Sequence, residues 1–274
     1  MVAGSPGRPS RTKRRDSVVP YILDLSGACA KLKRAKTHID AVHDAIEEKL
    51  GPHPIHYGLG RKFDRDQSAV VFYINRLVEI DNGWSLIIGD AIHNLRGALD
   101  HLTWQLAIRH CNGVEPKDGN SIQFPFETDS AKWPRKFLDA ADAAKLEDLQ
   151  PFNNDPVTTA MRLPHPFVML KTLSNGDKHR TIEVTTHHPA NYMIPKLILR
   201  DCEFRGQNVG LTAFAGTPKL GDEVFRVPVT ATGLNPDVEL EGYVSCYIAV
   251  RERWNVDDVL AQIYQRVETL LRRF

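Results

Sequence analysis

The sequence lacks the elements that mark several common classes of protein. It contains no apolar run long enough to cross a bilayer and no signal-peptide segment behind its basic first residues. It also lacks the G-x-S-x-G, Walker, dinucleotide-binding and H-E-x-x-H motifs. These absences argue against serine hydrolases, P-loop ATPases, dinucleotide enzymes and zinc proteases. They lead us to expect a cytoplasmic protein with no membrane partner.

Cysteine is scarce and widely spaced. The four cysteines, Cys29, Cys111, Cys202 and Cys246, form no C-x-x-C pair. Zinc and redox motifs need closely spaced cysteines, and a chain this long does not depend on a disulfide framework. We therefore expect four buried free thiols, no metal and no other cofactor. His53 and His56 have no third ligand nearby and are expected to lie in a loop.

Basic residues are concentrated at the start of the chain. Five of the 35 basic residues lie within residues 1–15, which contain no acidic residue, whereas the rest of the chain is slightly acidic. Residues 1–19 offer little to bury, so we expect a disordered tail. The preferred interpretation is a solvated extension, and the alternative is an arm that contacts nucleic acid phosphates.

Hydrophobic periodicity divides the chain into helical and strand-like parts. Apolar residues recur at steps of three and four, the helical period, in residues 23–52, 84–111, 130–150, 155–176 and 255–274. Residues 53–67 read as a loop and 69–80 as a strand. From residue 181 the pattern alternates, which predicts strands over 181–187, 195–201, 209–215, 224–231 and 238–252.

These patterns predict an α+β fold. A helical bundle is expected over residues 20–180, an antiparallel β region over 181–254, and a C-terminal helix over 255–274 that packs back on the bundle. We expect these parts to form one interlocked unit.

The helix expected over residues 84–111 has two unlike sides. One carries an apolar stripe, and the other carries Asp90, His93, Gly97, Asp100, His101 and Trp104. No lysine or glutamate occurs between residues 85 and 114, although a solvated helix face is usually rich in both. Glycine inside a helix costs about 1 kcal/mol relative to alanine and permits close approach of another backbone. Gly97 and Trp104 are therefore expected to contact another helix of the bundle or a second copy of the chain.

Arg96 and His101 are the candidate catalytic pair on this helix. They lie five positions apart, roughly 140° around the helix axis, so one helix cannot aim both at one point. Two copies that cross near Gly97 would bring both kinds of group into one cleft. The alternative interpretation is a solvated ion pair between Arg96 and Asp100, with His93 and His101 buried and hydrogen-bonded.

The hexapeptide "RGALDH" resembles the Arg-x4-His signature of the HEPN superfamily. That resemblance implies a helical-bundle dimer with metal-independent ribonuclease activity of toxin or anti-phage type, in which Arg96 and His101 are catalytic. Gly97 departs from the pattern, because active members usually carry a polar residue after the arginine. "IIGDAIHNLRGALDHL" together with "LSNGDKHR" is also similar to a group of bacterial and phage proteins, a resemblance that implies no activity.

A second polar cluster follows the helix expected over residues 155–176. Asp177, Lys178, His179 and Arg180 are consecutive, and they precede the first strand of the β region. Such a run is either an ordinary surface turn or a phosphate-binding site with a histidine proton donor.

The expected function is a homodimeric, metal-independent ribonuclease. Arg96 would stabilise charge on the phosphate and His101 would transfer protons. The supporting or binding residues would be His93, Asn94, Asp100, Asp177, Lys178, His179 and Arg180. The alternative is a non-catalytic interaction or assembly protein of bacterial or phage origin, which Gly97 favours.

Overall fold

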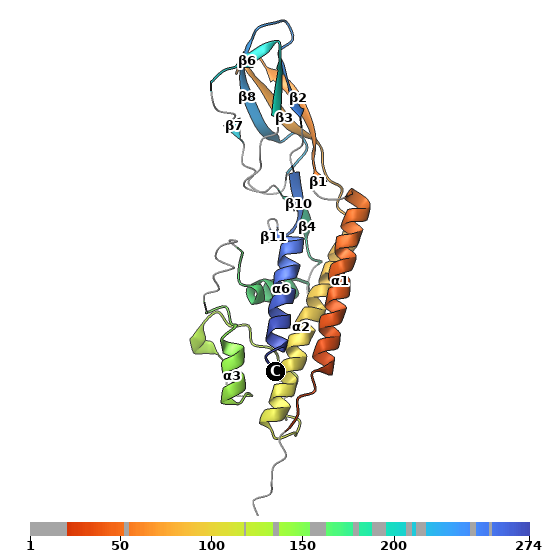
Figure 1. The fold of residues 1–274 in the computed structure, drawn as a ribbon, viewed down its shortest axis with the longest axis vertical. Coiled ribbons are helices and arrows are strands. Elements are labelled where there is room, and N and C mark those ends of the chain that lie inside the picture. Colours follow the sequence, from red (N-terminus) through yellow and green to blue (C-terminus); the bar gives the residue numbers. More distant parts are fainter. Residues whose placement is uncertain are drawn as a thin grey trace, which may run out of the picture.

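The structure is a computed structural model in which helices and strands occupy opposite ends of an elongated molecule (Figure 1). It describes residues 21–51, 55–117, 119–133, 137–153, 163–177, 181–187, 196–206, 210–211, 218–241, 245–251 and 254–274. Helices and antiparallel sheets are both extensive, so the expected α+β class is confirmed.

Four helices form the bundle. They are α1 (Ser26–Leu50), α2 (Asn82–His110), α5 (Pro166–Asp177) and α6 (Val256–Leu271). α1 lies along α2, its principal neighbour, and α6 contacts α1, α2 and α5. The C-terminal helix therefore packs back on the bundle, as the sequence predicts.

The boundaries of α1 and α6 follow the sequence signals closely, whereas α5 begins only at Pro166 of the helix predicted over residues 155–176. On α1 the repeating apolar residues Ala28, Leu32, Ala35, Val42 and Ile46 are buried. The Asn255 side chain caps α6, because its Oδ1 accepts hydrogen bonds from the backbone N–H groups of Asp257 and Asp258. Both the predicted stripe and the predicted cap are confirmed.

α2 is the central helix of the bundle. The Asp81 side chain caps its N-terminus by accepting a hydrogen bond from the Gly83 N–H at 2.7 Å. Asn112 and Gly113 have positive φ values of 55° and 86°, which ends the helix where the sequence predicts. The apolar stripe is fully buried, with exposed fractions of 1% or less for Ile88, Ala91, Ile92, Leu95, Ala98, Leu99, Leu102 and Leu106.

The strands form three antiparallel groups. They are β1 (Ile55–His56), β2 (Gly58–Asp64), β3 (Ala69–Arg76), β4 (Val184–His187), β5 (Lys196–Arg200), β6 (Cys202–Phe204), β7 (Gly210–Leu211), β8 (Glu223–Ala231), β9 (Asp237–Glu241), β10 (Ser245–Val250) and β11 (Trp254–Asn255). The largest sheet has the order β2-β3-β8-β6, with β7 also paired to β8. A second contains β1, β4, β10 and β11, and β5 pairs with β9.

The loop predicted over residues 53–67 is wrong, because β2 lies within it and pairs with β3. The sequence of β2 does not resemble a strand, because it contains two glycines and three charged residues, and these residue types are uncommon in strands. Gly60 has a specific reason to be glycine, because a Cβ there would lie 2.5 Å from the Tyr73 ring on the partner strand. The turn is held by Asp64, whose carboxylate accepts hydrogen bonds from the N–H groups of Asp66 and Gln67.

The β part of the molecule draws on both halves of the chain. β2 and β3 lie within residues 20–180, the range assigned to the helical bundle, and β3 confirms the strand predicted over residues 69–80. β3 nevertheless pairs with β8, which lies beyond residue 181. The rings of Phe72 and Phe225 stack across this pair with centroids 4.5 Å apart. A boundary at residue 181 therefore does not separate the bundle from the sheet.

The third predicted helix is shorter than expected. The sequence predicts helix over residues 130–150, whereas α3 covers only Ala140–Glu147, with Asp139 as its cap, after a single short turn at Ser130–Lys132. Trp133 has an extended backbone, with φ −61° and ψ 115°. The residue before a proline disfavours the helical conformation, and Pro134 follows Trp133.

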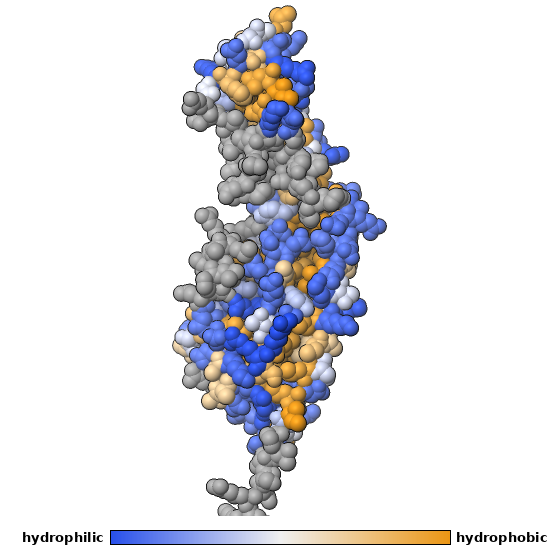
Figure 2. Space-filling view, viewed as in Figure 1, coloured by the Kyte–Doolittle hydropathy of each residue, from blue (hydrophilic) through white to orange (hydrophobic). Residues whose placement is uncertain are grey.

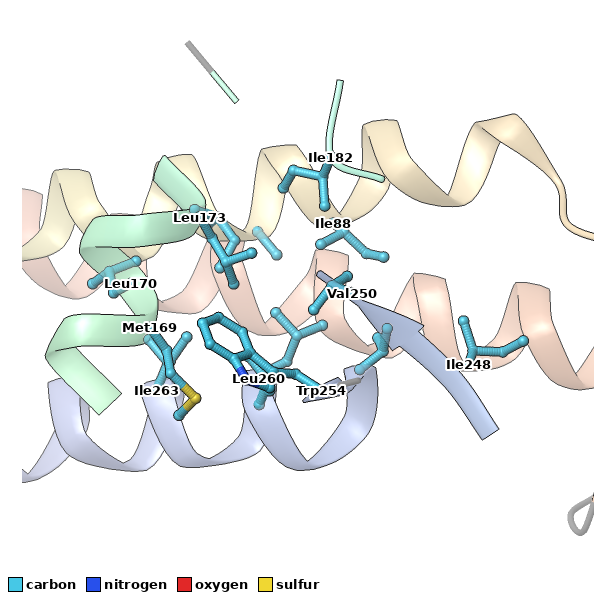
Figure 3. Close-up of a cluster of buried hydrophobic side chains, with 14 of the residues drawn as sticks. Ile88, Met169, Leu170, Leu173, Ile182, Ile248, Val250, Trp254, Leu260 and Ile263 are labelled. Atoms are coloured by element: carbon cyan, nitrogen blue, oxygen red, sulfur yellow. The ribbon is translucent and has the colours of Figure 1, made fainter. Parts of the chain in front are cut away.

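A hydrophobic core runs through the bundle and continues toward the sheets. Figure 3 shows part of this core, in which Leu173 of α5, Ile88 of α2 and Val250 of β10 belong to one cluster of buried side chains with Leu260 of α6. Within the described residues we find no helix with the length and hydropathy of a membrane span. Figure 2 shows hydrophilic residues over much of one face of the bundle, with apolar patches between them.

Candidate functional site at the junction of α2 and α5

The two polar clusters of the sequence meet where the last turn of α5 lies against α2. Gly89 of α2 is buried, and a Cβ built on it would lie 2.8 Å from Oδ1 of Asp177. Asp177 is the last residue of α5. Only glycine leaves room for the carboxylate at this distance from the α2 backbone. The structure thus joins two motifs that are more than eighty residues apart in the chain.

Asp177 lies in a mixed electrostatic environment. Burial raises the pKa of its carboxyl group, the nearby carboxylate of Asp90 raises it further, and His93 lowers it. Asp90 and His93 are exposed on α2. A carboxyl group with a raised pKa, a second carboxylate and a histidine therefore share one solvent-accessible junction, and such groups can exchange protons.

Asn94, the next residue on α2, has a local role. Its side chain is 9% exposed, and Nδ2 donates a hydrogen bond to the backbone carbonyl of Asp90 at 2.8 Å. The amide nitrogen is therefore used within the helix, and the side chain is buried.

Arg96 faces α5 and the segment that follows α2. Its guanidinium donates to Oγ of Ser174 on α5 at 3.3 Å and to Oε1 of Gln123 at 3.2 Å. The guanidinium carbon also lies 4.5 Å from the centre of the Phe126 ring. All of these partners are distant in sequence, so no local pattern reveals them.

The ion pair predicted between Arg96 and Asp100 is present, with Nε and Oδ2 3.5 Å apart. It is not a solvated pair, because only 13% of the Arg96 side chain is exposed. The other carboxylate oxygen of Asp100 accepts a hydrogen bond from the Phe124 N–H at 2.8 Å. Asp100 therefore fixes the segment after α2 as well as the arginine.

His101 and Gly97 face α1. A Cβ built on Gly27 of α1 would lie 2.6 Å from Nδ1 of His101, whose side chain is otherwise exposed. A Cβ on Gly97 would lie 3.5 Å from Cδ of Lys31, also on α1. Within one chain, Arg96 and His101 therefore point to different neighbours, as their spacing predicts.

Trp104 lies farther along the same helix. A Cβ built on Gly119 would be 2.9 Å from its ring, so Trp104 packs against the short turn at Gly119–Ser121 of its own chain. Its side chain is only partly exposed. The neighbours that the structure provides for Gly97 and Trp104 thus come from the same chain.

Several predicted residues lie outside the part of the chain that the structure describes. They are residues 1–20, His53, and Lys178, His179 and Arg180. Among the described residues, no three His, Cys, Asp or Glu side chains are grouped to hold a metal ion.

Cys202 and Cys246 are buried as expected, whereas Cys29 is exposed and Cys111 is partly exposed, so the prediction of four buried thiols is wrong. Cys29 is exposed because it lines a surface groove together with Leu32.

His165 is a buried histidine that the sequence reasoning passed over. Burial lowers the pKa of its imidazole to about 4, and Nδ1 accepts a hydrogen bond from the Phe167 N–H at 3.2 Å. A neutral imidazole that caps the start of α5 explains both observations. His165 is therefore a structural group.

No protein-family model matches the chain, and no curated protein or solved structure was found to be similar to it.

Proposed function

We propose that this protein is a cytoplasmic, metal-independent ribonuclease that acts as a homodimer in the manner of a toxin or anti-phage enzyme, as the HEPN resemblance implies. We place its acid–base groups at the junction of α2 and α5 within each chain and not at the Arg-x4-His pair. In this proposal His93 and Asp177 provide the acid–base chemistry. The supporting observation is the close approach of Asp177 to Gly89, which brings the motif of α2 to the end of α5. Helix packing alone does not require a carboxylate at this contact.

The proposed reaction is cleavage through the neighbouring 2′-hydroxyl of RNA. The carboxylate of Asp177 accepts the 2′-hydroxyl proton, the 2′-oxygen attacks phosphorus, and the bond from phosphorus to the 5′-oxygen breaks. His93 donates a proton from its imidazole ring to the leaving 5′-oxygen. The raised pKa of Asp177 favours its role, because a carboxylate with a raised pKa is a stronger base than that of an ordinary aspartate.

A cation near the phosphate completes the proposed site. The sequence predicts Arg96 for this role, but its two terminal nitrogens already donate to Ser174 and Gln123, and its charge is paired with Asp100. Lys178 and Arg180 directly follow Asp177 in the chain, and we assign the phosphate contact to them.

The test is cleavage of single-stranded RNA and DNA in the presence of a chelator. Wild-type protein is expected to cut RNA only, since the mechanism needs the 2′-hydroxyl. His93→Gln and Asp177→Asn are expected to lose about a hundredfold or more in rate, and His101→Gln is expected to stay near the wild-type rate. If His101→Gln loses activity and His93→Gln keeps it, the dimeric Arg-x4-His site is correct and the junction is not.

A second candidate function is an interaction protein without catalysis. The observation that favours it is a groove of about 520 Å³ between α1 and α6, with Leu32, Tyr264 and Leu271 among its lining residues and Lys33 and Arg272 beside them. Such a groove can accept a partner helix. A folded wild type that leaves a broad set of RNAs intact would favour this candidate over the ribonuclease.

A further inference from the structure

We propose that Arg96 is a positioning residue that fixes the last turn of α5, and with it the Asp177 carboxylate, against Gly89 of α2. Its importance for catalysis rests on the proposed function, whereas the positioning itself is a property of the fold.

The contact between Arg96 and Ser174 ties the two helices together near Asp177. Ser174 lies three residues before Asp177, about 4.5 Å along the α5 axis. It is 5% exposed, and its hydroxyl donates to the Lys171 carbonyl at 3.2 Å while it accepts from Arg96. The guanidinium thus holds the turn of α5 that carries the carboxylate.

The guanidinium is itself fixed from other directions. Asp100 pairs with its Nε, Gln123 accepts from its second nitrogen, and the Phe126 ring lies against its face. Lys171 of α5 donates to the Phe126 carbonyl at 3.0 Å, which closes the connection from α2 through this segment to α5. A planar group with several fixed donors suits this position, and a lysine cannot reproduce it.

The fixed turn determines how Asp177 titrates. Burial against α2 raises the pKa of its carboxyl group, and the described titratable groups that act on it are Asp90 and His93 of α2. If the turn of α5 loosens, the carboxyl gains water and moves away from both Asp90 and His93. The gain of water reverses the largest effect and lowers the pKa toward the ordinary value of 3.8, and distance from Asp90 lowers it further, whereas distance from His93 removes the smallest effect and raises it.

The sign of the pKa change at Asp177 distinguishes two possible effects of Arg96: holding the carboxyl in position, or acting on it only through its positive charge. Loss of a nearby positive charge alone makes a carboxylate harder to form, so it raises the pKa. Loss of position lowers the pKa. Removal of Arg96 therefore gives opposite results under the two explanations.

The experiment is an NMR titration of the ¹³C-labelled Asp177 carboxyl in the full chain. We compare wild type with Arg96→Met, Arg96→Lys and a matched control, Arg61→Met, which removes an exposed arginine of β2. Both Arg96 variants are expected to lower the pKa of Asp177, and Arg61→Met is expected to leave it unchanged. An Asp177 pKa that rises or stays constant in Arg96→Met would overturn the proposal.

Two further arms keep the result interpretable. Ser174→Ala removes one partner of the guanidinium, so it should shift the Asp177 pKa in the same direction by a smaller amount even if Arg96→Met does not fold. RNA cleavage is measured in parallel, and a fall in kcat with an unchanged KM is the expected consequence of misplaced proton transfer. If the pKa falls while wild type cuts no RNA, the positioning stands and the proposed function fails.

Discussion

The two sides of α2 lack lysine and glutamate for different reasons. Toward α1, the contacts at Gly97 and at Gly27 are steric, with the stem of Lys31 and the ring of His101 as neighbours. Toward α5, Arg96 and Asp100 make directed polar contacts in partly buried surroundings. The absence of lysine and glutamate from α2 thus accompanies close packing on one side and a specific polar network on the other.

The comparison predicts that packing dominates stability on the side facing α1. Ala35 is fully buried on α1, whose principal neighbour is α2. Ala35→Leu should lower the free energy of unfolding by about 2–3 kcal/mol, because the extra atoms have no space. Urea denaturation measures the change. The matched control is Ala30→Leu on an exposed position of the same helix, and an equal loss there would contradict the packing explanation.

On the side of α2 that faces α5, the directed polar contacts should contribute less to the free energy of unfolding than the packing against α1 does. Asp100→Ala removes the acceptor for the Phe124 N–H and the partner of Arg96. The expected loss is about 1–2 kcal/mol, reduced by the partial exposure of the carboxylate. Asp44→Ala, an exposed acidic position on α1, serves as the control in the same denaturation series. Indistinguishable unfolding of the two variants would show that the network does not stabilise the fold.

A substitution at Gly97 tests whether the side of α2 facing α1 packs within one chain or against a second copy. A Cβ at this position would make an ordinary contact with Lys31, so Gly97→Ala should gain up to about 1 kcal/mol through helix propensity. Sedimentation analysis of the same variant should show an unchanged oligomeric state. A less stable and more monomeric variant would instead place Gly97 in an interface between two copies of the chain, as the HEPN resemblance implies.

The pH dependence of stability should show the smallest effect. Asp177 has a raised pKa in the folded protein, so its ionisation opposes folding as the pH rises from 3.8 through the raised value, and this penalty persists at neutral pH. Asp177→Asn should therefore be more stable than wild type at neutral pH. Below pH 3.8 the two should converge.

Asp139 offers the opposite case. The hydrogen bond from the Asp142 N–H lowers the pKa of its carboxyl group, so the ionised form stabilises the fold above pH 3.8. This stability is lost as the pH falls through the lowered value. Asp139→Asn should consequently be less stable than wild type at neutral pH. Thermal unfolding of wild type, Asp177→Asn and Asp139→Asn at several pH values measures both effects. Changes of equal sign in the two variants would contradict the assigned electrostatics.

The sequence predicts the features that depend on neighbours close in the chain. The apolar repeat of α1, the cap at Asn255 and the pairing of Arg96 with Asp100 all involve residues a few positions apart. β2 was missed because its strand character comes from its partner, where Gly60 makes room for Tyr73. Local residue types could not indicate that pairing.

The candidate site could be predicted only as two separate clusters. The signals at residues 89–101 and 177–180 were visible, but their contact depends on how α5 docks against α2. The glycine that permits this contact, Gly89, carries no local signal, because nothing in the sequence shows which side chain approaches it. Ser174, Gln123 and Phe126 likewise acquire their roles only through the arrangement of distant segments.

The assignment of the α2–α5 junction as the active site is tested most directly by two variants, Gly89→Ala and Gly176→Ala. The measurement is their rate of single-stranded RNA cleavage with chelator present. The two substitutions are identical and lie on the two sides of the same junction. A methyl group at Gly89 would lie 2.8 Å from the Asp177 carboxylate, whereas one at Gly176 meets nothing within 4 Å. We expect Gly89→Ala to lose about tenfold or more in rate and Gly176→Ala to match wild type. Equal rates for the two variants, or a wild type that leaves the RNA intact, would contradict the assignment of the junction as the active site.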